Sequence, residues 1–194
     1  MTAGRTLAVG LAAVAGGALL FGLVMWLPRW TTGMTTRATV GAAAPAPAAP
    51  APSGRKIKAR LFYVAEDGTK LTSVERDVAY GEGPVEQARE IITAQIAPVV
   101  EPLVSAVPPG TTLRAVFITD GGEAFVDVSR EIVSAHPGGT LGELLTVYTL
   151  VNALTENLPV VTAVQVLVDG KEVETLSGHI DLRRPLAKNL TWVQ

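Results

Sequence analysis

The alternation of hydrophobic and polar positions changes along the chain, and each change predicts a new element. Between residues 57 and 63, apolar side chains at odd positions alternate with mostly basic ones, which is typical of a strand with one buried face. Asp67-Gly68 is a favourable hairpin turn and separates this run from a second strand-like run at 71–80. This part of the sequence therefore predicts a β-hairpin.

Two helices are predicted further along the chain. Residues 84–96 open with a proline, which suits the first turn of a helix, and their apolar residues recur on one face until Pro98 ends the pattern. Thr-Leu-Gly-Glu at 140–143 matches a capping box, in which the Thr140 side chain accepts the third helical N–H and Glu143 reaches back. The helix that follows is expected to turn six side chains toward a core: Leu141, Leu144, Leu145, Tyr148, Val151 and Leu154.

Four more strands complete the predicted domain. Thr112–Ile118 and Glu123–Val128 flank a turn, and the apolar run Val160–Val168 predicts a buried strand with Lys171–Leu176 as its returning partner. Aromatic residues such as Phe117 fall at strand or helix periods and are expected in the core. Strands at both ends with two helices between them predict an α+β fold, a twisted β-sheet packed on one face by two α-helices.

The beginning of the chain has a different composition. Residues 7–27 are apolar and carry no charge, and 21 helical residues span about 30 Å, the thickness of the hydrocarbon core of a bilayer. Trp26 and Trp30 lie at the far end, where indole rings favour the headgroup region. We therefore expect one transmembrane anchor within residues 1–30. A cleaved signal peptide is the alternative, although its apolar region is usually shorter.

Residues 31–54 are expected to be a Pro/Ala-rich linker. Proline removes backbone donors, so the stretch APAPAAPAPS at 44–53 predicts an extended spacer rather than a strand or helix. Residues 55–194 then form the folded domain, with 13 of the 16 basic and all 18 acidic residues. The basic residues on either side of the apolar run are nearly balanced in number. The short head of the chain nevertheless favours a single-pass protein of the cytoplasmic membrane whose C-terminal domain is extracytoplasmic.

Composition excludes several classes of function. The chain has no cysteine, which rules out disulfides, thiolate metal sites, iron–sulfur clusters and a cysteine nucleophile. A net charge of −2 argues against a general nucleic-acid binder. The glycines do not form a phosphate-binding motif, and the acidic residues are scattered rather than grouped as in a calcium loop.

Few residues suggest chemistry. His179 and Asp181 are two positions apart on an expected extended segment and could orient an imidazole for a metal or as a base, or could simply hold a strand end. His136 is expected to be exposed in a loop. Asp127 and Ser129 lack the strained turn of a serine nucleophile, and Ser129 is better explained as a cap after the strand that ends at Val128. We therefore predict no catalytic, cofactor-binding or metal-binding residue.

Several segments, taken in order, resemble the GerMN domain, a sporulation and spore-germination module. The resemblance covers about residues 58–190 and departs at 97–103, where a Gly-Pro would be expected after the first helix. The segments that carry it are Gly83-Pro84, AVPPGTTL at 106–113, GEAFVDVS at 122–129, YTLVNALT at 148–155, VQVLVDGK at 164–171 and LSGHIDL at 176–182 before Pro185-Leu186.

The resemblance implies a bacterial envelope domain, similar to the ring-building motifs of secretion and sporulation complexes and not known to be catalytic. It supplies no catalytic residue or cofactor to transfer, and the sporulation role itself is not carried over. We expect one GerMN-like domain behind an anchor, a non-enzymatic interaction or assembly module. Its expected partners are envelope proteins or further copies of itself, and not nucleic acid. The alternative is an envelope ligand-binding or hydrolytic domain that uses the His179/Asp181 neighbourhood.

Overall fold

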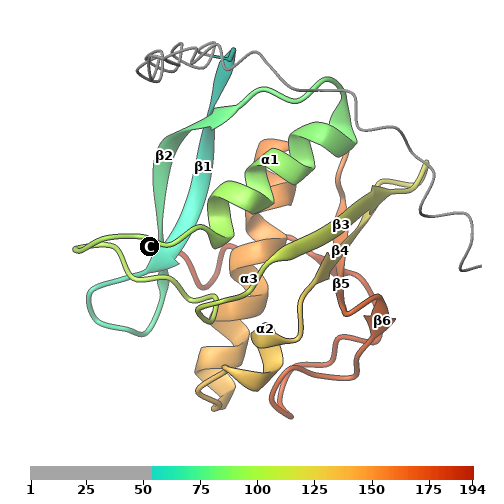
Figure 1. Cartoon of the computed structure of the whole chain (residues 1–194). Coiled ribbons are helices and arrows are strands. Elements are labelled where there is room, and N and C mark those ends of the chain that lie inside the picture. Colours follow the sequence, from blue (N-terminus) through green and yellow to red (C-terminus); the bar gives the residue numbers. More distant parts are fainter. Residues whose placement is uncertain (1–53) are drawn as a thin grey trace, which may run out of the picture. The chain divides into compact units, whose positions relative to one another are not determined.

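The computed structural model describes residues 54–194 (Figure 1). The predicted anchor at 1–30 and nearly all of the predicted linker at 31–54 lie outside the described residues. Within the described part, no helix combines the length and apolar composition that a membrane span needs.

The domain contains both strands and helices, which confirms the mixed α+β class. A short helix at 131–134 and a short strand at 186–187 were not expected, and the strand predicted at 160–168 begins three residues later. In chain order the elements are β1 (Lys56–Val64), β2 (Leu71–Ala79), α1 (Pro84–Ile96), β3 (Leu113–Ile118), β4 (Glu123–Val128), α2 (Glu131–Ser134), α3 (Thr140–Asn157), β5 (Ala163–Val168), β6 (Lys171–Glu172) and β7 (Leu186–Ala187).

The strands form two sheets, whereas the sequence pattern predicted one. β1 and β2 make a two-stranded antiparallel sheet. The second sheet has the order β3-β4-β5-β6, with β4 parallel to β5 and with β7 also paired to β5. α3 contacts both β1 and β5, so it lies between the two sheets, with α1 packed against it (Figure 1). The expected single sheet with two helices on one face is therefore wrong.

The position of α3 explains its composition. It packs against β1, α1 and β5, and 11 of its 18 residues are buried. A helix enclosed in this way must be apolar on more than one side, or must pair its polar groups internally. The predicted apolar stripe is consequently too simple: Leu150 and Leu154 are fully buried, but Leu141 is 38% exposed.

Side-chain carboxamides close the edge of β1 that faces away from β2. The Phe62 N–H donates to Gln95 Oε1 at 2.9 Å, and Gln95 Nε2 donates to the Phe62 carbonyl at 2.7 Å. The side chain of Asn157 makes the same pair of bonds with the backbone of Arg60, both at 2.8 Å. Because each amide offers one donor and one acceptor, it replaces the pairing that a neighbouring strand would give. The hairpin therefore ends at β1 and does not join the second sheet.

Replacing Gln95 with Met keeps the volume but leaves the N–H and carbonyl of Phe62 without partners in a buried place. We expect the free energy of unfolding to fall by about 3 kcal/mol, since each orphaned buried group costs about 1–3 kcal/mol. Urea unfolding of residues 54–194 measures this. The matched control is Arg89→Met, an exposed position on the same helix. A change in the Gln95 variant no larger than in the control would contradict the role given to the amide.

Candidate functional site

The strongest polar cluster of the domain is centred on Glu143 at the beginning of α3. The helix has Gly139 at its N-cap, with φ of 82°, and no side-chain cap hydrogen bond. Thr140 is thus the first helical residue rather than the cap, and Glu143 lies one position beyond the capping-box site. The predicted capping box is therefore wrong. Glu143 is instead fully buried and turns toward the segment that follows β6.

The Glu143 carboxylate holds this segment through both of its oxygens. Oε1 accepts the Leu176 N–H at 2.8 Å. Oε2 accepts the His179 N–H at 2.8 Å and lies 3.1 Å from Nδ1 of the same histidine. The donors are 33 and 36 residues away in sequence, so the carboxylate ties the long connection between β6 and β7 to the first turn of α3.

The electrostatics of the cluster favour a charged Glu143. Burial by itself raises the pKa of this carboxyl, but backbone N–H groups of Ser177, Leu176, His179 and Ile180 outweigh that effect and hold its pKa below the ordinary value. The beginning of α3 adds the positive end of the helix dipole. A buried anion is therefore stabilised by oriented backbone donors.

His136 also lies near the beginning of α3, where its ring bonds to Thr146. Its Nδ1 accepts the Gly138 N–H at 2.9 Å, so Nε2 carries the proton of the neutral ring and donates to the Thr146 hydroxyl at 3.2 Å. That hydroxyl donates in turn to the Ala106 carbonyl. Burial is the main reason why the pKa of His136 lies below its ordinary value, and this outweighs the attraction of nearby Glu143. His136 is in a loop as predicted, but it is half-buried and bonded rather than exposed.

The predicted pair of His179 and Asp181 does not form. Asp181 is exposed and binds Arg183, with Nε and Nη2 of the arginine at 2.9 and 2.8 Å from its two oxygens. This ion pair holds the pKa of Asp181 well below its usual range. His179 turns to Glu143 instead. The segment is a series of bends rather than a strand, so residues two apart do not share a face.

Asp127 and Ser129 also serve the fold. Asp127 on β4 accepts the Gly170 N–H at 2.7 Å, and this bond attaches the turn that follows β5 to β4. Asp127 also accepts a hydrogen bond from Nε of Arg114 on β3 at 3.2 Å. The Ser129 hydroxyl accepts the Thr112 N–H at 3.0 Å. The N-cap of α2 is Arg130, which makes no side-chain cap bond.

The cluster holds part of a hydrolase arrangement. A Glu–His pair is the base half of a hydrolase triad, in which the acid is buried, and the His179 ring is exposed on the solvent side of Glu143. Among residues 54–194, no hydroxyl bonds to the other ring nitrogen of His179. The same residues contain no group of three or more acidic or histidine side chains arranged to hold a metal ion. The arrangement stabilises the connection between β6 and β7.

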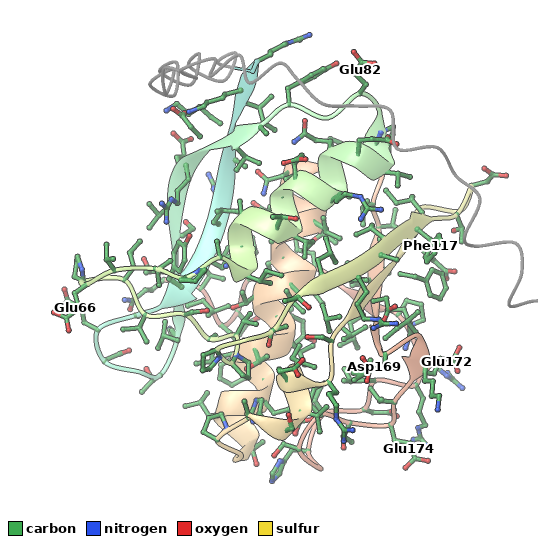
Figure 2. The ribbon with its side chains drawn as sticks, viewed as in Figure 1. Glu66, Glu82, Phe117, Asp169, Glu172 and Glu174 are labelled. Atoms are coloured by element: carbon green, nitrogen blue, oxygen red, sulfur yellow. The ribbon has the colours of Figure 1, made fainter. Side chains whose placement is uncertain are left out.

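Apolar side chains are exposed on the connection 97–112 and on β3. The connection 97–112, which includes the departure from the GerMN pattern at 97–103, lines a hollow of about 570 Å³ together with the end of α1. Its walls are mostly proline and aliphatic, and Val100 and Val104 on this connection are 83% and 55% exposed. Phe117 on β3 points away from the body of the domain and is 59% exposed (Figure 2). The expectation that Phe117 belongs to the core is wrong.

Comparison with known families agrees with this architecture. A family model described as Germane, sporulation and spore germination, matches residues 60–174. The chain belongs to this family. The resemblance seen in the sequence segments is thereby confirmed at the level of the family. No curated protein sequence matches the chain.

Solved structures with the same fold share little sequence with the chain. Tandem GerMN domains of the sporulation protein GerM from Bacillus subtilis match with a TM-score of 0.51 and 17% identity, over 70% of this chain and 46% of theirs. The first GerMN domain of GerM gives 0.49 and 16% identity, over 68% and 97%. A candidate lipoprotein from Clostridium perfringens gives 0.49 and 22% identity, over 69% and 88%. The chain spans less than half of the tandem structure, so that likeness concerns the fold alone.

The role of Glu143 can be tested with an isosteric variant. Glu143→Gln replaces one acceptor oxygen with an amide group that faces the backbone donors, so we expect unfolding to become easier by about 2–3 kcal/mol. Urea unfolding and hydrogen exchange of residues 175–180 measure the change. Thr140→Ala is the control and is expected to alter stability by less than about 0.5 kcal/mol, because Thr140 makes no cap bond. If Thr140→Ala lost more stability than this, the Thr140 side chain would cap the helix, as the capping box predicts.

A comparison of wild type with Glu143→Gln at different pH values tests the charge state of Glu143. Its folded pKa is lower than the ordinary value of 4.5, so its contribution to stability is complete above that pH and is lost as the pH falls through the folded pKa. We expect the stability difference between wild type and Glu143→Gln to narrow steadily below pH 4.5. A difference that stays constant down to the acid limit of folding would mean that the buried carboxyl is already neutral.

Proposed function

We propose that the chain is a membrane-anchored, extracytoplasmic interaction module of the bacterial cell envelope that works by surface contact and not by turnover. The observation that carries this proposal is the internal use of its reactive groups. Glu143, Nδ1 of His179 and His136 bond to backbone and side chains of the domain itself, and among residues 54–194 no hydroxyl bonds to the exposed side of the His179 ring. Hydrolysis by a Glu–His pair requires a nucleophile within hydrogen-bond reach of the histidine. The family match supports the same interpretation through its link to sporulation and germination proteins.

The anchoring part of the proposal rests on the sequence. Residues 7–27 suit one membrane span, and the proline-rich stretch at 44–53 suits a spacer between the membrane and the domain. A tether of this kind raises the local concentration of the domain in the plane of the membrane, so that weak contacts become effective. Exposed Phe117 and the hollow at 97–112 supply apolar contact area.

A topology experiment tests the anchored state. If the domain lies outside the cytoplasmic membrane, protease added to intact spheroplasts digests residues 55–194, while a cytoplasmic marker protein remains protected. Immunoblotting against the domain follows the loss, and lysed spheroplasts provide the positive control. Full protection of the domain in intact cells would overturn the proposed orientation, and release of the undigested domain into the medium would indicate a cleaved signal peptide.

A paired experiment tests contact against turnover. The full-length protein in native membranes is crosslinked with an amine-reactive reagent, and the purified domain is assayed for hydrolysis of envelope substrates. We expect crosslinked protein partners and no turnover. His179→Ala is expected to lower thermal stability by removing one contact of Glu143, and to change no reaction rate. Turnover that disappears in a folded His179→Ala variant would contradict the interaction role and establish the hydrolytic alternative.

A further inference from the structure

Most strand edges of the domain are closed. On β1, Arg60 and Phe62 bind side-chain carboxamides, and the Val64 N–H donates to the Val104 carbonyl at 2.8 Å. The outer edge of β5 is occupied by β6 at one end and β7 at the other. α1 packs against β3, and Val116 in the middle of that strand is only 2% exposed. Strand addition at any of these edges would need a native contact to be broken.

The outer edge of β2 is filled only at its two ends. The Leu71 N–H donates to the Trp192 carbonyl at 2.7 Å, and the Leu71 carbonyl accepts the Gln194 N–H at 2.9 Å. Residues 192–194 thus pair with the first residue of β2 in a parallel sense. At the far end, Gln87 Nε2 donates to the Ala79 carbonyl at 3.1 Å. This edge already accepts backbone pairing from outside the hairpin.

Between these ends lies an open stretch. The bond from the Tyr80 N–H to the Arg55 carbonyl fixes which residue pairs carry the β1–β2 hydrogen bonds, and the register then turns the backbone groups of Ser73, Glu75 and Asp77 outward. Within residues 54–194, no hydrogen bond uses these outward N–H and carbonyl groups. Glu75 and Asp77 are exposed. The open stretch has the length of a short strand and is flanked by paired residues.

Two of the three residues whose backbone groups face outward on this open stretch, Glu75 and Asp77, are acidic. Asp77 binds Lys58 at 2.6 Å across the hairpin. Glu75 stands opposite Arg60 in the register, but Arg60 binds Glu156 at 3.2 Å instead. Glu75 therefore has no ion-pair partner within the described part of the chain. Because Glu75 and Asp77 are two residues apart, they lie on the same face of the strand.

We propose that residues 73–77 of β2 form a docking edge for an extended segment of a partner protein that carries Lys or Arg at alternate positions. The segment adds a third strand to the hairpin, and the backbone groups of Ser73, Glu75 and Asp77 supply its hydrogen bonds. Glu75 and Asp77 face its basic side chains on one side of the enlarged sheet. This inference rests on the proposed interaction function and adds the surface and the chemistry of the partner.

The test uses the full-length chain in detergent micelles and two synthetic peptides. Acetyl-Lys-Val-Lys-Val-Lys-Val-amide is the basic strand probe, and the same peptide with Glu in place of Lys is its charge-reversed control. Hydrogen exchange of individual amides is measured with each. We expect the basic peptide to slow exchange at Ser73, Glu75 and Asp77 by about tenfold or more, and the acidic peptide to leave it unchanged. No slowing at these amides, or equal slowing by both peptides, would overturn the proposal.

Variants separate the backbone and charge contributions. Glu75→Pro removes an outward N–H that the hairpin does not use, so it should abolish the slowing caused by the basic peptide. Glu75→Lys keeps the backbone and reverses the charge, and it should weaken peptide binding about fivefold or more. Glu172→Lys, on the other sheet (Figure 2), is the matched control and should bind as wild type does. If Glu75→Lys and wild type bound the basic peptide equally well, the proposal that the partner segment is basic would be overturned.

Two further outcomes identify where a failure lies. Slowing at Ser73, Glu75 and Asp77 that grows with protein concentration, without any peptide, would assign the edge to a second copy of the chain and overturn the basic partner. If the peptides fail while the membrane-held protein still crosslinks to envelope proteins, the docking edge is wrong and the interaction function stands. If the peptides do not bind and the membrane-held protein forms no crosslinks, the interaction function is wrong as well.

Discussion

The fold depends on side-chain carboxamides that pair with backbone as if they were peptide groups. In four places an Asn or Gln amide both accepts from a backbone N–H and donates to a backbone carbonyl. The amides and their backbone partners are Gln95 with Phe62, Asn157 with Arg60, Asn152 with Asn189, and Gln87 with Gly81 and Ala79. An amide carries the donor and acceptor of a peptide unit without its chain, so it can complete a strand edge where no strand fits. This allows α3 to separate two sheets while the edge of β1 stays paired.

The Glu143 side chain also replaces a backbone partner, but it does so as a charged acceptor. Its oxygens collect backbone N–H groups from a connection that lies more than 30 residues away in sequence, and the gain from these bonds exceeds the cost of burying the carboxylate. Nδ1 of His179 bonds to this carboxylate, and His136 bonds to Thr146 on the same helix. These polar groups therefore help to hold the domain together. The proposed interaction function uses the outer surface and the open edge of β2.

The sequence predicted the local elements well because their signals are local. Alternation with a Gly turn located the first hairpin, and Pro84 with Pro98 bracketed α1. The division into two sheets was not predictable in this way, because it depends on Gln95 meeting Phe62 across 33 positions. Periodicity shows which face of a strand is buried, but it does not show what occupies the edge of the strand.

The errors at the candidate site also have physical causes. A shift of one residue in the helix start moved Glu143 from a cap position to a buried one, and Asp181 was expected near His179 only because the segment was taken as extended. A signal was available: on a helix that begins at Thr140, position 143 shares a face with buried Val147 and Leu150. An acidic residue in that row requires a buried partner, although its identity could not be deduced from the sequence.

In the hairpin, polar side chains close the edge of β1, while β2 stays open between its paired ends. Hydrogen exchange of the free, full-length protein, resolved for single amides, tests this most directly. We expect slow exchange at Arg60, Phe62 and Val64, whose outward N–H groups are bound, and fast exchange at Glu75 and Asp77, whose outward N–H groups face solvent. Equal exchange rates on the two edges of the hairpin would contradict it.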